Sequence, residues 1–288
     1  MRIPRWQKIL MTFLGIVTAL MICFDIALYR AFFYNPSHIT TRYEEIVSPS
    51  IPEAMDQVSI VFLTDIEYDE RYFTDQKADE LFSSVRQLNP DVLLIGGDLF
   101  AYDADLSDPV REKMVNWLSS IQAPLGKFAV YGEQDLSSEN HRLIVEDVYH
   151  KSQIELLNNS SVLLANQSTS GIRLGGLNIA ADPNALSAAF VPDQFTLLVS
   201  HYPDNLLAAS QSGLPVGFAL AGNSHGTQID WPLFGGYKEF TGSQTINRNH
   251  MSRLNFDYEI SNGIGCIDVQ ARLNSPVEIL YLTLNRKA

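Results

Sequence analysis

The sequence predicts an α/β domain whose sheet contains parallel strands, preceded by a membrane-spanning N-terminal segment. Three observations lead to this prediction. Short apolar runs alternate with longer amphipathic ones beyond residue 58, as expected for strands connected by helices. Residues 9–24 form an unbroken apolar run. Five of the later apolar runs end on side chains that can bind a metal ion, and the carboxyl ends of parallel strands are where such sites form.

The composition suits one sizeable globular domain, or two small ones, and argues against nucleic acid as a partner. The chain has 288 residues, 46% of them hydrophobic and 18% charged, which is enough to bury a core. Residues 1–34 carry four basic side chains against Asp25, a balance of +3. Since the whole chain carries −13, the remainder carries −13 − 3 = −16. A surface this acidic repels the phosphates of DNA or RNA.

The N-terminal run "ILMTFLGIVTALMICF" (9–24), extended by "DIALYRAFFY" (25–34), is long enough to span about 30 Å of hydrocarbon. Basic residues precede it, which favours a cytoplasmic N-terminus and an exported remainder. A cleaved signal peptide and a lipoprotein anchor at Cys23 are the alternatives. No small-x-small cleavage site follows the run, and Ile22 stands where a lipoprotein needs a small residue. We therefore expect a single-pass cell-membrane protein that contacts the membrane through residues 9–33.

This interpretation divides the chain into a signal anchor (1–34), a proline-containing spacer (35–57) and an extracytoplasmic domain (58–288). Within the domain, hydrophobic periodicity predicts helices over 78–88, 109–121 and 139–152, and a short one after His201. The predicted strands cover 58–65, 90–98, 126–135, 161–167, 172–182, 195–201, 216–226, 265–273 and 277–285.

Five strand ends carry carboxylate, imidazole or amide groups. Their sequences are Asp65-Ile66-Glu67, Gly97-Asp98, Gly132-Glu133-Gln134-Asp135, Ser200-His201 and Gly222-Asn223-Ser224-His225-Gly226. A single polar residue after a strand is ordinary turn chemistry, and Asp65 or Asp98 alone fits a helix N-cap. Together, however, clustered carboxylates repel one another unless a cation neutralises them. The pattern therefore favours a metal site.

These motifs, "TDIE", "GGDL", "YGEQDL", "VSHYPD" and "AGNSHGTQ", resemble in order and spacing those of the calcineurin-like metallophosphoesterases, in particular their membrane-associated bacterial branch. The resemblance runs from about residue 58 to 284 and implies a four-layer α/β/β/α sandwich. It also implies two metal positions with Asp98 as the bridge. The first would use Asp65, Glu67, Asp98 and His225, and the second Asp98, Glu133, His201 and Asn223.

Four positions depart from the family pattern. Glu67, Glu133 and Asn223 stand where the family has His, Asn and His, and Gln134 replaces a histidine that assists the transferred phosphoryl group. More carboxylate and less imidazole favour Mn²⁺, Mg²⁺ or Ca²⁺ over zinc or iron, with one or two ions bound. Gln134 cannot supply a proton, a loss that costs about 10²–10⁴-fold in rate. His141 falls on the predicted helix 139–152, where we expect it at the surface.

Two functions follow from the resemblance. In the first, the protein is a membrane-anchored phosphoesterase that hydrolyses a phosphorylated small molecule or lipid with metal-bound water. In the second, the departures mark a catalytically impaired pseudoenzyme that acts as a membrane-tethered binding or regulatory module.

Overall fold

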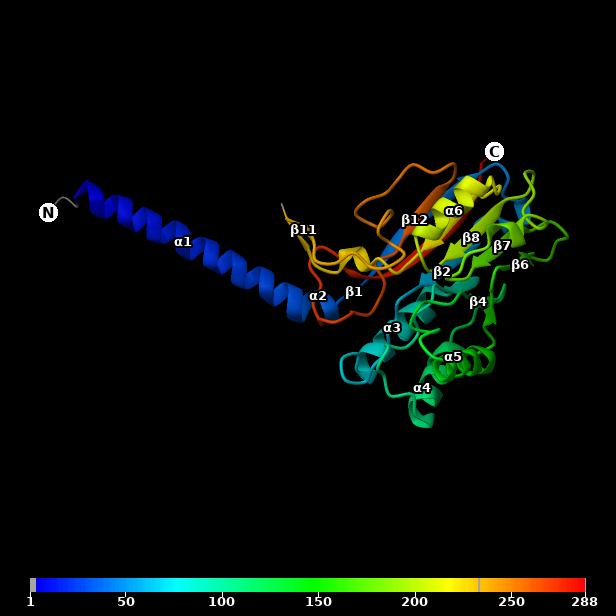
Figure 1. Cartoon of the computed structure of the whole chain (residues 1–288), viewed down its shortest axis with the longest axis horizontal. Helices are drawn as coiled ribbons and strands as arrows, with labels where there is room; N and C mark the ends of the chain where they lie inside the picture. Colours follow the sequence, from blue (N-terminus) through cyan, green and yellow to red (C-terminus); the bar gives the residue numbers. More distant parts are fainter. Residues whose placement is uncertain (1–3, 233, 288) are drawn as a thin grey trace.

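Two β-sheets packed face to face form the body of the protein, and a long N-terminal helix extends away from it (Figure 1). The structure, a computed structural model, describes residues 4–232 and 234–287. The first sheet has the strand order β1-β13-β2-β3-β4-β5, and the second has β12-β9-β8-β7-β6. Neighbouring strands run parallel except at the pairs β13–β2 and β6–β7, which are antiparallel.

The strands of the first sheet are β1 (Ile39–Ser48), β2 (Ser59–Leu63), β3 (Val92–Ile95), β4 (Lys127–Ala129), β5 (Glu155–Leu156) and β13 (Val277–Arg286). Those of the second are β6 (Ser160–Leu164), β7 (Ile172–Leu177), β8 (Thr196–Ser200), β9 (Phe218–Ala221) and β12 (Asp257–Ile260). A small hairpin joins β10 (Asp230–Trp231) to β11 (Gly235–Gly236).

The helices are α1 (Arg5–Tyr29), which continues through the π-helical turn η1 (Arg30–Tyr34) into α2 (Asn35–Ser37), and then α3 (Asp75–Leu88), α4 (Asp108–Ser119), α5 (Glu139–Lys151) and α6 (Asp204–Ser212). Short 3₁₀ turns are η2 (Glu53–Met55), η3 (Pro183–Leu186) and η4 (His225–Thr227).

Three apolar clusters separate four layers. Helices α3, α4 and α5 pack on the outer face of the first sheet, the two sheets pack on each other, and α6 with its neighbouring loops covers the second sheet. Strand β2 shows why the apolar runs are continuous. Val61 and Leu63 face the helices while Ile60 and Phe62 face the other sheet, so every side chain of the strand is buried. The predicted α/β/β/α sandwich is therefore confirmed.

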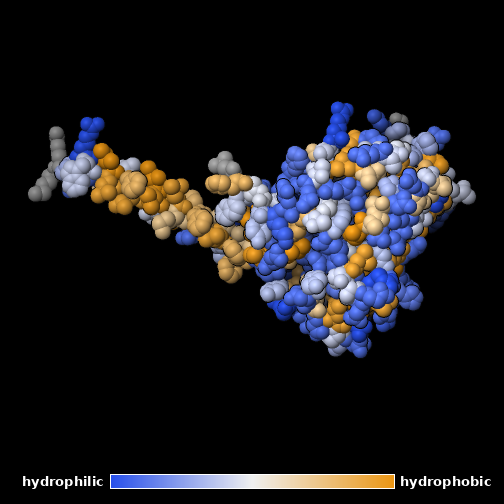
Figure 2. Space-filling model, in the orientation of Figure 1, coloured by the Kyte–Doolittle hydropathy of each residue, from blue (hydrophilic) through white to orange (hydrophobic). Residues whose placement is uncertain are grey.

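The N-terminal helix lies outside this packing. It stretches over residues 5–37 with a mean hydropathy of 2.3 in its most apolar window, none of which is buried. Figure 2 shows its apolar surface against the mostly polar surface of the body. This helix is long and apolar enough to cross a membrane.

Residues 35–57 do more than separate the helix from the domain, which corrects the predicted spacer. They contain β1, which pairs in parallel with β13 over ten residues, from Ile39 opposite Val277 to Ser48 opposite Arg286. The strand is hard to recognise in the sequence because it lies at a sheet edge. Only Ile46 of its ten side chains is fully buried, so apolar and polar positions do not alternate clearly.

Two further expectations about the elements were wrong. Residues 265–273 do not form a strand but a loop that wraps around the amide of Gln228, whose Nε2 donates to the carbonyls of Ile267 and Val269. His141 is not at the surface, since it is 3% exposed. It begins the buried stripe of α5, which continues one turn later with Ile144 and Val145.

Arg42 attaches β1 to the rest of the domain and provides a test of this correction. Its guanidinium contacts Glu278 (3.3 Å), which is buried, and Glu259 (2.7 Å). We expect Arg42→Ala to lower the free energy of unfolding by about 3 kcal/mol, because Glu278 stays buried without its cation. Urea unfolding of the full chain in detergent measures this. Arg286→Ala, which removes a 3.8 Å contact to the exposed Glu53, is the control and should cost below about 0.5 kcal/mol.

Candidate metal centre

The predicted ligands lie in the loops that follow the central strands of both sheets. Asp65 follows β2, Asp98 follows β3, and His201 directly follows β8. Asn223 and His225 follow β9. The strands run parallel within each sheet at these positions, so their carboxyl ends bring the loops to one edge of the sandwich.

Asp65, Asp98 and His201 form the tightest group. One potential ligand atom from each lies within 4.8 Å of the other two. His201 Nε2 is 3.3 Å from Asp98 Oδ2 and 3.9 Å from Asp65 Oδ1. All three side chains are buried, so solvent does not screen their charges. These three residues can hold a divalent metal ion.

His201 is oriented by the backbone. Its Nδ1 lies 2.7 Å from the carbonyl oxygen of Gly96. A carbonyl only accepts, so Nδ1 carries a proton and donates it, which leaves the lone pair of Nε2 on the side of the carboxylates in the neutral ring. Metal-binding histidines are commonly fixed by such a contact.

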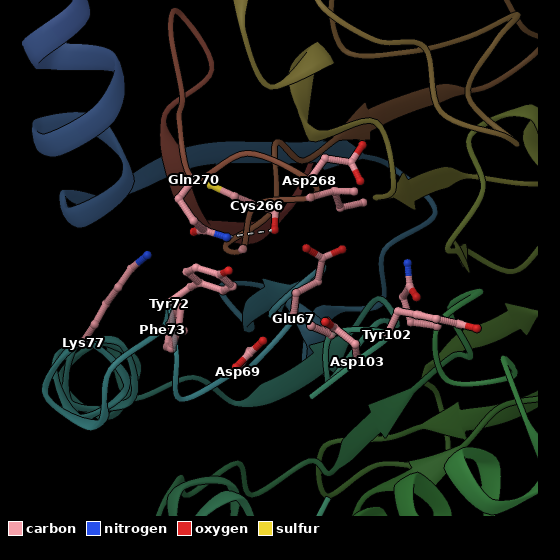
Figure 3. A pocket seen from close by; sticks show the side chains of 14 residues that line it. Glu67, Asp69, Tyr72, Phe73, Lys77, Tyr102, Asp103, Cys266, Asp268 and Gln270 are labelled. Atoms are coloured by element: carbon pink, nitrogen blue, oxygen red, sulfur yellow. Dashed lines mark hydrogen bonds between the residues drawn. The ribbon is translucent and has the colours of Figure 1, made fainter. Parts of the chain in front are cut away.

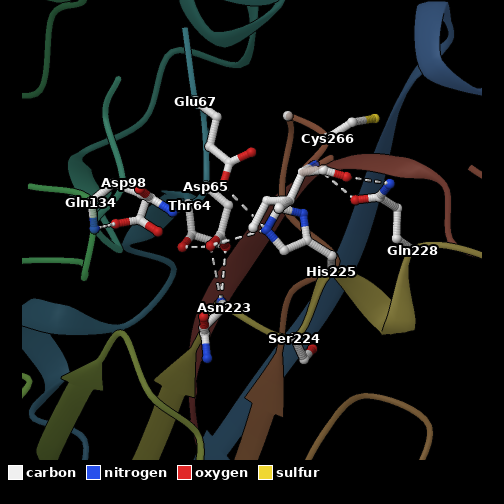
Figure 4. Close-up of polar contacts among 12 residues, drawn as sticks. Thr64, Asp65, Glu67, Asp98, Gln134, Asn223, Ser224, His225, Gln228 and Cys266 are labelled. Atoms are coloured by element: carbon white, nitrogen blue, oxygen red, sulfur yellow. Dashed lines mark hydrogen bonds and ion pairs between the residues drawn. The ribbon is translucent and has the colours of Figure 1, made fainter. Parts of the chain in front are cut away.

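A second group lies beside the first. His225 Nε2 is 3.6 Å from Asp65 Oδ1 and 3.5 Å from Glu67 Oε1. The backbone N–H of Asn223 donates to both oxygens of Asp65, at 3.1 and 2.9 Å, and its side-chain Nδ2 donates to the carbonyl of Thr241 (2.7 Å). Figure 4 shows Asp65 and Glu67, from the loop after β2, converging with Asn223 and His225, from the loop after β9.

Five of the seven predicted ligands bury a side-chain atom that has no hydrogen-bond partner. These atoms are Glu67 Oε1, Asp98 Oδ2, His201 Nε2, Asn223 Oδ1 and His225 Nε2. An unpaired buried polar atom costs about 1–3 kcal/mol, and five in one place is far above the usual frequency. All five are oxygen or imidazole nitrogen, which are the donors that bind divalent cations. The residues present therefore fit a metal ion.

The backbone of the same residues is unusual. Five predicted ligands have a positive φ between 46° and 60°, namely Asp65, Glu67, Asp98, Asn223 and His225. Non-glycine residues rarely adopt this region, at a cost of about 1–3 kcal/mol each, and they persist only where the surroundings enforce it. Such strain concentrates at functional sites.

Gly132 shows how closely the loops approach. A Cβ at this position would overlap both the Oδ1 atom and the backbone nitrogen of Asp98. Any larger residue would therefore displace the Asp98 carboxylate from Asp65 and His201. Glycine is needed at this position because it leaves room for that carboxylate.

Glu133 and Gln134 occupy the border of the site. Glu133 Oε2 accepts a hydrogen bond from the hydroxyl of Tyr202 (2.5 Å). The backbone N–H of Gln134 donates to Asp98 Oδ1 (2.8 Å). Gln134 also lines a hollow next to the site. Within the described part of the chain, the tight group thus contains three of the seven predicted ligands, with Glu67, Asn223 and His225 next to it.

Two residues that support the site were not predicted to do so. Asp135 is fully buried, and its carboxylate accepts from the backbone N–H groups of Asp98 (3.0 Å), Leu99 (3.0 Å) and Gly132 (2.8 Å), which fixes both loops. Asp135 is the last residue of the third strand-end motif, so its position in the sequence already indicated a place at the site. The role of the second residue, Arg272, depends in part on contacts with two distant segments, at residues 31–35 and at His225.

Arg272 is fully buried with all five guanidinium donors engaged. Four of them donate to the backbone carbonyls of Gly265, Asn262 and Ser275. The fifth contacts His225 Nδ1 at 3.2 Å. Arginine cannot accept, so Nδ1 is the acceptor and the neutral ring of His225 carries its proton on Nε2, facing Glu67. The two histidines are thus held in opposite tautomers.

The backbone of Arg272 contacts the N-terminal helix. Its N–H donates to the carbonyl of Ala31 (2.8 Å), and its carbonyl accepts from Asn35 Nδ2 (2.8 Å). The end of the helix and the candidate metal centre therefore share one residue.

Excess negative charge makes the site retain protons. Burial raises the pKa of the Asp98 carboxyl to about 7, although His201 works in the opposite direction. Burial alone would lower the pKa of His201, but the charges of Asp98 and Asp65 and the hydrogen bonds to Asp98 and Gly96 together raise that pKa to about 10. A cation at this position would compete with these protons.

The chain was compared with protein-family models, curated proteins and solved structures. No family model matches. The chain is 23% identical over 263 residues to the uncharacterised metallophosphoesterase YkuE of Bacillus subtilis (strain 168), covering 88% of this chain and 87% of that protein. It is 27% identical over 184 residues to the phosphodiesterase YaeI of Escherichia coli (strain K12), covering 61% and 63%. It is 20% identical over 244 residues to YkoQ, another uncharacterised metallophosphoesterase of Bacillus subtilis, covering 79% and 84%.

Among solved structures, a 5'-nucleotidase precursor from Thermus thermophilus is similar with a TM-score of 0.43 and 13% identity. The match covers 79% of this chain and 55% of that one, so the likeness is loose.

The tautomer and pKa of His201 predict how metal binding responds to pH. We expect the affinity of the full chain for Mn²⁺ to rise about tenfold per pH unit between pH 8 and 9, where Asp98, with a pKa of about 7, is already ionised. Over this range His201, with a pKa of about 10, must release one proton for each ion bound. Competition with a fluorescent chelator measures this affinity. His225→Ala should keep the slope and His201→Ala should lose it. An affinity independent of pH would contradict the assignment of His201.

Proposed function

We propose that this chain, like the metallophosphoesterases to which it is similar, hydrolyses a phosphate ester with a divalent metal held by Asp65, Asp98 and His201. The convergence of unpaired buried ligand atoms on this group is the observation that carries the proposal. A bound divalent cation supplies a Lewis acid for a phosphoryl oxygen and lowers the pKa of water.

The residues of the chain divide between two positions. His201 directs its Nε2 toward the carboxylates of Asp65 and Asp98 while Gly96 holds its Nδ1, so we assign the principal ion to the group that these three residues form. We assign Glu67 and His225, which lie 3.5 Å apart, together with Asn223 and Glu133, to a second, weaker position. His225 has to lose its Nε2 proton before it can bind there, because Arg272 occupies its Nδ1. Carboxylate-rich ligands favour Mn²⁺, Mg²⁺ or Ca²⁺ in both positions.

We place the reaction at a membrane surface. The helix over residues 5–37 is the proposed anchor, with the basic N-terminus in the cytoplasm and the folded domain on the other side. A lipid or envelope phosphate would then lie close to the site.

The second candidate function is a membrane-tethered binding or regulatory module with little or no turnover. Two observations favour it. Gln134 cannot donate a proton to a leaving oxygen, and Tyr202 already occupies one oxygen of Glu133.

Removal of Asp98 separates the two functions. We expect Asp98→Ala to reduce metal-dependent hydrolysis of bis(p-nitrophenyl) phosphate and p-nitrophenyl phosphate to background, because Asp98 belongs to the principal metal position. The assay uses the full chain in detergent with added Mn²⁺, Mg²⁺, Ca²⁺ or Zn²⁺, and metal content is measured in parallel. Asp193→Ala, at an exposed position, is the control. A folded wild-type chain that stays inactive with every metal would support the module instead.

Gln134 predicts slow turnover that one substitution should improve. We expect Gln134→His to raise kcat by about 10²-fold, with a new dependence on pH near the pKa of the added imidazole, because a proton donor returns beside Asp98. The pH profile of kcat for p-nitrophenyl phosphate measures this change. Unchanged kcat with wild-type metal content would show that the missing proton donor is not what limits the rate.

A further inference from the structure

A hollow leads away from the candidate metal centre toward the N-terminal helix. It has a volume of about 320 Å³ and begins at Glu67 and Gln134. From there it continues past Cys266 to Tyr72 and Lys77 (Figure 3).

A second hollow of about 400 Å³ continues in the same direction. It shares Tyr72, Lys77 and Gln270 with the first. Its other side is formed by Phe32 and Phe33 of η1, at the end of the N-terminal helix. The two hollows therefore form one route from the metal centre to that helix, and Lys77 lies where they meet.

Lys77 is the one cation among the described residues that line either hollow. Its Nζ lies 4.5 Å from the centre of the Phe73 ring, and within residues 4–232 and 234–287 it forms no ion pair. Burial lowers its pKa to about 8. A partly buried ammonium group that has no ion-pair partner is stabilised by an anionic ligand.

The acidic residues of the first hollow do not fill that role. Asp69 and Asp103 are both paired with Arg71, and Asp268 is paired with Lys238 at 2.7 Å. Their charges are therefore offset by cations outside the hollow. Glu67, the remaining acidic residue of this hollow, faces His225 at 3.5 Å on the side of the metal centre, and Glu80 lines the second hollow. Lys77 is the lining cation that an anionic ligand can neutralise.

The far end of this route lies at the expected depth of lipid headgroups. The 25 residues of α1 extend about 37 Å at helical rise, which exceeds the roughly 30 Å of hydrocarbon in a bilayer. The aromatic residues that follow fit the membrane–water interface, where such side chains gather. Phe32 and Phe33 are 47% and 67% exposed there. Phe234, at 89% exposure, and Trp231, which stacks on Phe24, add apolar surface near the same helix.

We propose that the ligand of this route is an anionic membrane lipid that enters sideways from the bilayer. Its headgroup lies in the first hollow with Lys77 as counter-ion, and its acyl chains stay along Phe32 and Phe33. This inference rests on the proposed function and names its substrate class. It makes Lys77 a residue that selects lipid-borne phosphate over soluble phosphate.

The test measures binding without turnover. The full chain, stripped of metal with EDTA, is placed in phosphatidylcholine nanodiscs that contain a phosphatidic acid analogue with a diazirine in one acyl chain. After irradiation, mass spectrometry locates the crosslinks and gives their yield. We expect crosslinks at residues 32–36 and 72–77, and about a tenfold lower yield for Lys77→Met, since a charge-assisted contact is lost. Lys151→Met, which removes an exposed lysine on α5, is the matched control and should keep the yield.

Three results would overturn the inference. The first is an unchanged yield and crosslink position in Lys77→Met, with its thermal unfolding curve matching that of the wild type. The second is complete competition by glycerol 3-phosphate at equal concentration, because the site would then take the free phosphate ester. The third is metal-dependent hydrolysis of soluble esters without lipid crosslinking, which would leave the proposed function standing.

Discussion

The buried contact between His201 and the carboxylates of Asp65 and Asp98 is the constraint around which the rest of the structure is arranged. These three ionisable groups are buried away from water, so their negative charge has to be balanced either by bound protons or by a bound cation. The tightly packed glycine at 132 and the carboxylate of Asp135 beneath the loops keep these groups together against their own repulsion.

This constraint also explains why the sequence was informative about the site. Polar side chains at the ends of buried strands are expensive unless they act together, so their positions could be recognised without coordinates. The order β2, β3, β8 and β9 followed from apolar runs that are buried on both faces. Asp65, Asp98 and His201 were placed in one site for that reason, and the structure brings them within 4.8 Å of one another.

What the sequence did not reveal depends on contacts between distant segments. Strand β1 has a single fully buried side chain and owes its place to β13 and to Arg42, which contacts Glu278 far along the chain. The loop over 265–273 has the composition of a strand, but its carbonyls receive the amide of Gln228 instead of a neighbouring strand. The opposite tautomers of the two histidines depend on Gly96 and Arg272, which no local pattern connects to them.

Arg272 connects the N-terminal helix mechanically to the candidate metal centre. Its backbone is hydrogen-bonded to Ala31 and Asn35, while its guanidinium contacts His225. A soluble fragment that begins after residue 37 would lose both backbone partners and leave the Arg272 loop free to shift. The imidazole it supports would shift with it, so the folded domain cut from its N-terminal helix is not equivalent to the same domain in the full chain. A change in the direction of the helix would, by the same linkage, be transmitted to the imidazole.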